Sequence, residues 1–342
     1  MKSEIIKKIT YARAGLLGNP SDGFNGKTIS IPIKNFQAEI MLWPSENLIF
    51  ILNNEDQDEY EKISDMVDYV GCNGYYGGIR LIKAAIVVFI KFCRANKITL
   101  SNCNFTISYR SSIPRQSGLA GSSAIIISTI RALMEFFCVD EKVIPPQVLA
   151  NVALSAESEE LGITAGLQDR VVQSYGVPVY MDFSREAFKS NGNIHGKYVA
   201  LDKNIYQLPQ FLIAWNNRPS ESGKVHSDVK ARFLAGDKGV IATMDKFASI
   251  AEEGYFALKN KDIKKLHGLM NANFDLRRKL FGDKVVGSDN IKMIELARSC
   301  DAAAKFPGSG GAIIIMPKKN SDINKIIDEF NNHRYFIERV IL

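Results

Sequence analysis

The feature of this sequence that most limits its fold is the close alternation of short apolar strands with helical runs. Residues 28–52 contain three strand-like runs, TISIPI, QAEIML and LIFIL, separated at residues 34–35 and 44–45. The block IRLIKAAIVVFIKFCR at 79–94 follows with helical periodicity, and FTISYR at 105–110 alternates as a strand does. Neighbouring strands of this kind beside helices predict an α+β fold rather than a doubly wound parallel sheet.

The rest of the chain continues the alternation. AIIISTIRALMEFF at 124–137 is apolar nearly all round and predicts a buried helix. The other expected helices are 147–161, 226–235, 239–260, 262–279, 288–300 and 321–332, and the other expected strands are 177–183, 210–215, 312–317 and 335–342. A chain of 342 residues has room for about two domains. Because residues 184–204 are polar and irregular, we expect one domain at 1–190 and another at 191–342, and we expect the acidic stretch 53–68 to be a surface segment.

Composition and cysteine usage narrow the class of protein. With 46% hydrophobic and 23% charged residues, the chain is neither disordered nor fibrous. Five cysteines without a CxxC pair argue against a disulfide framework or a zinc cluster, and they favour a reducing compartment. The N-terminal MKSEIIKKITYARAG lacks an apolar run, so we expect no signal peptide, and the apolar stretch Ala84 to Ile90 is too short to span a bilayer. We therefore expect a cytoplasmic protein with no membrane partner. The net charge of +6 is mild, and no basic stripe with interleaved aromatics suggests nucleic acid as a partner.

Three glycine-containing segments stand out, at 11–22, 114–124 and 305–311, and none is a GxxxxGK[ST] or GxGxxG motif. In the second, Gly118 and Gly121 permit close backbone approach to a ligand before the buried helix begins. The N-terminus of a helix favours phosphate, and the hydroxyls of Ser122 and Ser123 could reach a phosphate oxygen or Mg²⁺. The alternative is an ordinary serine N-cap. The third segment, before a buried strand, is either a close backbone approach or a tight turn.

A pair of acids and one arginine are the candidate chemical groups. Glu157 and Asp169 lie in SAESEELGITAGLQDR, the first on a helix and the second after a glycine-containing turn. One could bind a metal while the other faces a substrate hydroxyl, and the alternative is a solvated acidic face. Arg13 could pair with Asp169 and with a transferred phosphoryl group, and the alternative is a surface arginine.

The ordered set of these motifs resembles the GHMP kinases, a family of galacto-, homoserine, mevalonate and phosphomevalonate kinases. The family's first motif looks like residues 12–22, its second like 114–124 and its third like 307–311. Its E-x₁₁-D spacing matches Glu157 and Asp169. The resemblance implies two domains, an N-terminal α+β domain with a left-handed βαβ-type unit and a C-terminal ferredoxin-like domain. It also implies ATP as a substrate and Mg²⁺ as the cofactor.

Within the family, the chain is most similar to the plant-type kinases of D-glucuronate. The strings ARAGLLGNPSD, GYYGGIRL, IPRQSGLAGSSA, SGKVHS, FDLRRKLFGD and AAAKFPGSGG match them. This likeness implies phosphorylation of the anomeric hydroxyl of D-glucuronate. A galactose-, fucose- or heptose-type sugar kinase and a non-catalytic nucleotide and sugar sensor are the alternatives. Two positions depart from the family pattern: Gly121 is an extra residue before the serine pair, and Asn19-Pro20 replaces the usual Glu-His.

The resemblance implies the following roles. Asp169 and Arg13 are the expected catalytic residues, and Glu157 with Ser122 or Ser123 would bind Mg²⁺. The expected phosphate loop is Pro114, Gly118, Leu119, Ala120, Gly121, Ser122, Ser123 and Ala124. Trp43 and Ser45 are candidates for the adenine, although a tryptophan beside proline is commonly core packing. The sugar would meet Asp22, Gly308, Ser309 and Gly310, and its carboxylate would meet Arg218 or Lys224 in a basic, Ser/Gly-rich loop. A homodimer is a possible assembly.

Overall fold

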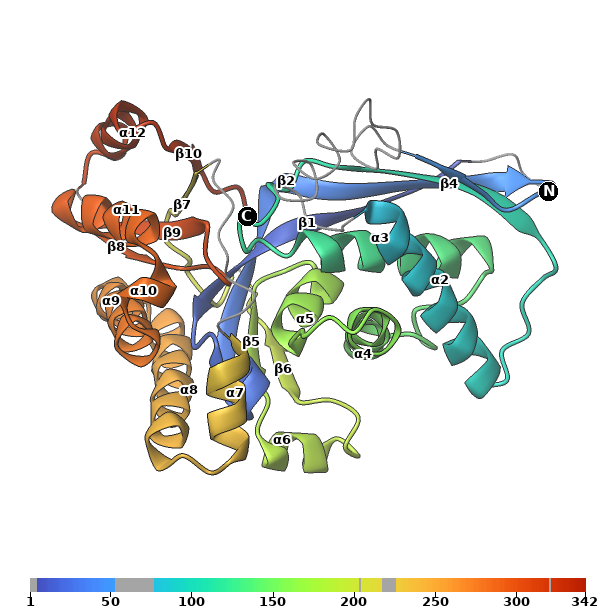
Figure 1. Ribbon diagram of the computed structural model, residues 1–342, viewed down its shortest axis with the longest axis horizontal. Coiled ribbons are helices and arrows are strands. Elements are labelled where there is room, and N and C mark those ends of the chain that lie inside the picture. Colours follow the sequence, from blue (N-terminus) through green and yellow to red (C-terminus); the bar gives the residue numbers. More distant parts are fainter. Residues whose placement is uncertain (1–4, 53–76, 203, 217–225, 320) are drawn as a thin grey trace. The chain divides into compact units, whose positions relative to one another are not determined.

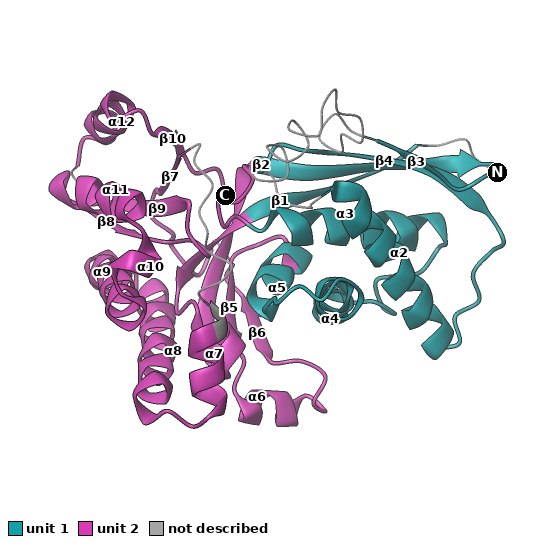
Figure 2. Cartoon of the chain, viewed as in Figure 1, with its two compact units in different colours: residues 1–12, 36–113, 120–174 teal, residues 13–35, 114–119, 175–342 magenta. Residues whose placement is uncertain are grey.

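The computed structural model describes residues 5–52, 77–202, 204–216, 226–319 and 321–342. The chain forms two compact units (Figure 2). Unit 1 comprises residues 1–12, 36–113 and 120–174, and unit 2 comprises residues 13–35, 114–119 and 175–342. Two long strands, β1 (Ile6–Leu17) and β2 (Lys27–Ser45), contribute residues to both units.

Unit 1 is a small sheet covered by helices. Strand β4 (Asn104–Ser111) pairs antiparallel with residues 38–45 of β2 and parallel with β3 (Ile49–Ile51). The helices are α2 (Gly78–Ala95), α3 (Gly121–Phe136), α4 (Pro146–Ser155), a π-helical turn η2 (Ala156–Glu160) and α5 (Leu167–Tyr175). Figure 1 shows α2, α3 and α4 on one face of the strands. Since α2 lies in sequence between the parallel strands β3 and β4, the predicted βαβ-type unit is present.

Unit 2 contains the predicted ferredoxin-like arrangement. The strands β7 (Leu212–Trp215), β8 (Ala302–Lys305), β9 (Ala312–Pro317) and β10 (Phe336–Arg339) form an antiparallel sheet in the order β10-β7-β9-β8. Helices separate β7 from β8 and β9 from β10 in sequence, which gives the βαββαβ pattern. Those between β7 and β8 are α7 (His226–Leu234), α8 (Lys238–Lys259), α9 (Ile263–Phe281), α10 (Asp283–Val286) and α11 (Ser288–Ser299), and α12 (Ile323–Asn332) precedes β10.

The core of this arrangement is apolar and closely packed. Phe274 of α9, Ile294 of α11 and Phe330 of α12 pack with strand residues such as Ile313 and Ile315 in one buried cluster. Helix α12 places Ile326 and Phe330 on one buried face at the spacing of four residues that a helix requires. The second part of unit 2 pairs β5 (Val179–Asp182) with residues 27–30 of β2 and with β6 (Lys197–Ala200). It also includes the short helices η1 (Ser21–Phe24) and α6 (Arg185–Ser190).

Strand β2 corrects the sequence prediction of a break at residues 34–35, because it continues through both of them. The polar pair stays extended because the C-terminal segment satisfies it. The Lys34 N–H donates to the Ile341 carbonyl over 2.8 Å, and the Asn35 amide donates to the Arg339 carbonyl over 2.9 Å. The side-chain oxygen of Asn35 also accepts from the Ile341 N–H. These partners are remote in sequence, so local polarity was misleading.

Other elements also differ from the sequence predictions. Strand β1, which includes residues 11–17 of the first glycine-containing segment, was not predicted. The loop that begins at Pro114 ends before Gly121, where α3 starts. Asp169 lies in α5, a helix that was not predicted, and residues 184–204, expected to be irregular, contain α6 and β6. Strand β8 and helix α10 were also missed. The stretch 53–68 lies outside the described residues, and the domain boundary at residue 190 stays a prediction.

No helix within the described ranges combines the length and apolar character needed to cross a membrane.

Candidate active site

Helix α3 begins at an unusual turn. Its N-cap is Ala120, which adopts a left-handed conformation with φ 62° and ψ 47° and provides no side-chain cap. Such a conformation costs a non-glycine residue roughly 1–2 kcal/mol, so the surroundings must hold it. The alternative of an ordinary serine N-cap is therefore wrong. The first N–H groups of a helix of 16 residues, with their partial positive charge, have no side-chain cap at Ala120.

The two serines of the first turn make different contacts. The hydroxyl of Ser122 donates to Oε1 of Glu157 over 2.7 Å. Ser123 is fully buried, and its hydroxyl contacts Oε1 of Gln173 at 2.6 Å and the Ala120 carbonyl at 3.2 Å. Ser122 therefore lies beside a carboxylate, whereas Ser123 is committed to internal hydrogen bonds.

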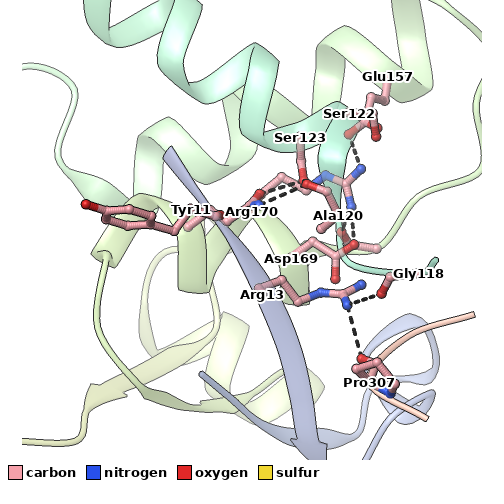
Figure 3. Close-up of polar contacts among 12 residues, drawn as sticks. Tyr11, Arg13, Gly118, Ala120, Ser122, Ser123, Glu157, Asp169, Arg170 and Pro307 are labelled. Atoms are coloured by element: carbon pink, nitrogen blue, oxygen red, sulfur yellow. Dashed lines mark hydrogen bonds and ion pairs between the residues drawn. The ribbon is translucent and has the colours of Figure 1, made fainter. Parts of the chain in front are cut away.

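Glu157 is a buried acid in the π-helical turn η2, with 1% of its side chain exposed. One carboxylate oxygen accepts from Ser122, and the other forms an ion pair with Arg170 (Figure 3). A solvated acidic face describes the exposed Glu159 but not Glu157. π-Helical turns occur often at functional sites, and in this turn Glu157 is buried while Glu159 is exposed.

Arg170 is a residue of unit 1 that the sequence analysis did not single out. Its guanidinium binds Glu157, donates to the Gly166 carbonyl over 2.8 Å and lies 3.4 Å from a carboxylate oxygen of Asp169. Asp169 occupies the first turn of α5 and keeps 21% of its side chain exposed. One buried guanidinium thus contacts both predicted acids. A signal was available, because a buried carboxylate requires a counter-charge.

Arg13 belongs to unit 2, where 5% of it is exposed, so the alternative of a surface arginine is wrong. Its guanidinium donates to the Gly118 carbonyl over 2.6 Å and to the Pro307 carbonyl over 3.1 Å (Figure 3). Its backbone N–H donates to the Leu119 carbonyl. Arg13 therefore joins the first, second and third glycine-containing segments. Its predicted pairing with Asp169 stays a prediction.

The glycines of these segments are needed for close packing. Gly118 has φ +67°, and a Cβ there would lie 2.8 Å from the backbone nitrogen of Ser309. A Cβ on Gly308 would lie 2.2 Å from the Gly118 carbonyl oxygen and 2.9 Å from the Arg13 guanidinium. The second and third segments are thus in backbone contact within unit 2, and the bland alternative of an isolated tight turn is wrong for the third.

Two further buried cations hold the third segment. Arg277 of α9 donates to the Gly308 carbonyl over 2.9 Å and to the Ser309 carbonyl over 3.3 Å. Burial lowers the pKa of Arg277 to about 10, opposed by the charge of Asp22. Lys305 is 1% exposed and donates to the carbonyls of Gly15 and Phe306 and to Oδ1 of Asn19. Burial, with the charges of Arg277 and Arg13, holds the pKa of Lys305 well below its ordinary value.

Asn19, one of the departures from the family pattern, is buried and structural in these contacts. Besides accepting from Lys305, its amide donates to the Phe306 carbonyl, and its own carbonyl accepts from Asn273. The position that carries glutamate in the family motif therefore connects β1 to the third glycine segment here. Neither Lys305 nor Arg277 was singled out from the sequence.

The remaining predicted site residues make fewer contacts with the groups described above. Trp43 is partly buried on β2 opposite Thr106, and the Ser45 hydroxyl donates to the Asn47 carbonyl. Their contact with adenine stays a prediction. Asp22 lies in η1, partly buried. Pro114 accepts from the Ser117 hydroxyl, and Ala124 is buried. Arg218 and Lys224 lie outside the described residues.

Two side chains of unit 1 offer oxygen ligands suited to a magnesium ion. No group of three or more His, Cys, Asp or Glu side chains able to hold a metal occurs in the part of the chain that the structure describes. Mg²⁺ is, however, commonly held by one or two carboxylates together with substrate phosphates. The adjacent oxygens of Ser122 and Glu157, 2.7 Å apart, fit that pattern of hard donors.

Comparisons with known proteins place this geometry in context. Residues 80–177 match the family model of the GHMP kinases N terminal domain, and residues 257–335 match that of the GHMP kinases C terminal. The chain is 46% identical over 325 residues to glucuronokinase 1 of Arabidopsis thaliana, covering 95% of this chain and 88% of that protein. It is 44% identical to the probable glucuronokinase 2 of the same plant, over 99% of this chain and 92% of the relative. Among solved structures, the mevalonate kinase of Methanococcus jannaschii is similar with a TM-score of 0.71, 18% identity and full coverage of both chains.

Proposed function

This chain belongs to the GHMP kinases, and on that basis we propose that it transfers the γ-phosphoryl group of ATP to the anomeric hydroxyl of D-glucuronate. The observation that supports this most is the 46% identity, over nearly the full length, to a plant glucuronokinase. That match spans 95% of this chain and 88% of the relative, whereas the structural neighbours below 25% identity indicate only the fold.

The proposed nucleotide site is the loop 114–124. The helix that follows offers N–H groups without a side-chain cap. Gly118 lets the loop pack against the backbone of Ser309. Backbone donors of this kind bind phosphate oxygens without bringing a mobile side chain. Phosphoryl transfer depends chiefly on positioning and on charge stabilisation, which such a loop supplies.

Ser122 and Glu157 are the proposed magnesium ligands, and this assigns the metal to the first serine of the pair. Ser122 is preferred because its hydroxyl already lies 2.7 Å from a carboxylate oxygen, whereas the hydroxyl of Ser123 is engaged by Gln173. A bound magnesium ion would neutralise negative charge on the nucleotide phosphates. Arg170 would hold the Glu157 carboxylate in place from its other oxygen.

Asp169 is the proposed base. It accepts or orients the proton of the anomeric hydroxyl while that oxygen forms a bond to the γ-phosphorus and the bond to ADP breaks. The guanidinium of Arg170 lies 3.4 Å from one carboxylate oxygen of Asp169. Arg13, whose guanidinium is held by the Gly118 and Pro307 carbonyls, is the residue that we propose to neutralise charge on the transferred phosphoryl group.

The proposed sugar site uses Asp22 for hydroxyls and the segment Gly308–Gly310 for backbone contacts. The carboxylate of a uronic acid requires a cationic or N–H partner, because burying it bare is costly. Arg218 and Lys224 remain the proposed partners. Replacement of Lys224 by alanine should then raise the KM of glucuronate more than that of a neutral sugar, and equal effects would remove Lys224 from this role. Cytoplasmic location and a homodimer also remain proposals.

A panel of sugars in an ADP-release assay tests the substrate. We expect glucuronate to exceed galactose, fucose and mannose by a wide margin, and a preference for any of the others would overturn the assignment. Asp169→Asn should lower kcat by at least about a hundredfold with little change in ATP affinity, because general-base catalysis contributes about 10²–10⁴. Wild-type turnover in that variant would exclude Asp169 as the base. Binding of ATP and sugar without turnover would instead indicate a sensor.

A further inference from the structure

Gln173 lies at the centre of a set of hydrogen bonds that no motif suggested. It is 3% exposed and occupies α5, four residues after Asp169, so the two side chains emerge from one side of the same helix. Its amide nitrogen donates to the carbonyls of Tyr11 and Ala120 over 3.0 and 2.9 Å. Its amide oxygen accepts from the Ser123 hydroxyl over 2.6 Å. Both N–H groups and the oxygen are therefore used.

The hydrogen bond from Gln173 to the Ala120 carbonyl matters most for the conformation of the loop before α3. Ala120 is the left-handed N-cap of α3, a conformation that an alanine keeps only when its surroundings fix it. Its carbonyl also accepts from the Ala124 N–H over 3.3 Å, and the Ser123 hydroxyl, which donates to Gln173, lies 3.2 Å from it. The contact with the Gln173 amide, at 2.9 Å, is the shortest that this carbonyl makes and comes from another helix.

We propose that Gln173 is a positioning residue that fixes the phosphate loop at Ala120 to the helix carrying Asp169, and so sets the affinity for ATP. This inference rests on the proposed nucleotide site. Tyr11, Ala120 and Ser123 come from a strand and from the start of a helix, and each makes a hydrogen bond with the Gln173 side chain. A single buried amide connects all three, so its loss releases the turn without removing any group that contacts nucleotide.

The test measures ATP binding by calorimetry in the absence of sugar, for wild type, Gln173→Leu and Gln173→Glu. Loss of two hydrogen bonds to backbone should raise the Kd and KM for ATP about tenfold, while the KM for glucuronate stays within about twofold. Gln173→Glu should bind ATP more weakly still, because its carboxylate would face two carbonyl oxygens. Ser123→Ala removes one bond only and should raise the Kd about threefold, which provides a milder variant if Gln173→Leu fails to fold.

Gln168→Leu is the matched control. Gln168 is also a glutamine of α5 with 3% exposure, and its side-chain oxygen has no hydrogen-bond partner among the described residues. This variant should bind ATP as wild type does. An unchanged Kd in Gln173→Leu and Ser123→Ala, or an equal rise in Gln168→Leu, would overturn the inference. A wild type that binds ATP and turns over no sugar would refute the proposed function instead, and a wild type that binds no ATP would refute both.

Discussion

The buried pair of Arg170 and Glu157 leads to a sharp prediction about stability. Their side chains are 4% and 1% exposed, so Arg170→Met would leave a carboxylate in the interior whose hydrogen-bond partner among the described residues is the Ser122 hydroxyl. Removing one member of a buried pair costs about 3–5 kcal/mol, a large share of a typical total of about 5–15 kcal/mol. Urea unfolding followed by circular dichroism should show a loss of that size at pH 7.

Two further variants separate the cost of leaving the Glu157 carboxylate unpaired from the cost of losing the packing of the Arg170 side chain. Glu157→Gln combined with Arg170→Met carries no buried charge and should recover more than half of the loss. Lys91→Met breaks the pair with Glu160 in the same unit, but Lys91 is 65% exposed, so it should cost less than about 1 kcal/mol. If Arg170→Met were as stable as Lys91→Met, or if the double variant were no better than the single one, the reasoning would be refuted.

Three other changes test the site. Ser122→Ala should raise the Mg²⁺ concentration needed for half-maximal ADP release several-fold, whereas Ser123→Ala should leave it near wild type; the reverse order would reassign the metal ligand. Gly118→Ala should lose about 1–3 kcal/mol in urea unfolding and most of the activity, because φ is +67° and a Cβ would lie 2.8 Å from the Ser309 nitrogen; an unaffected variant would contradict the close packing. The pKa of Lys305 lies well below 10.5 in the folded state and near 10.5 in the unfolded chain. At a pH between the folded and the unfolded pKa, the unfolded chain binds more protons, so the folded state gains stability as the pH rises. The stability difference between wild type and Lys305→Met should therefore shift in favour of wild type from pH 7 to pH 10, and a constant difference would argue against a depressed pKa.

Regular patterns in the sequence predicted the regular elements. The periodicity of 79–94 gave α2 nearly to the residue, and the alternation of 105–110 gave β4. Strand β1 was missed because its last six residues are all buried and show no alternation, and they include a glycine. Strand β8 was missed because AAAK favours a helix locally, whereas pairing with β9 makes it a strand. In both cases tertiary contacts outweighed local preference.

The candidate site was predictable where a motif existed. Glu157, Asp169 and Arg13 were chosen from spacing and resemblance, and all three make specific contacts in the structure. Their catalytic roles remain proposals. Gln173 was not found because its hydrogen-bond partners are 50 to 162 residues away in sequence. Arg170 was missed although its contacts with Glu157, Gly166 and Asp169 are local. What the sequence could have suggested is only that a buried acid needs a cation, without saying which one.

The central claim is phosphorylation of a uronic acid at its anomeric oxygen. It is tested most directly by incubating the purified protein with ATP, Mg²⁺ and D-glucuronate and identifying the product by phosphorus and proton NMR. We expect one new phosphate ester at C1, formed in step with ADP. No ester, or an ester at another position, would contradict the account.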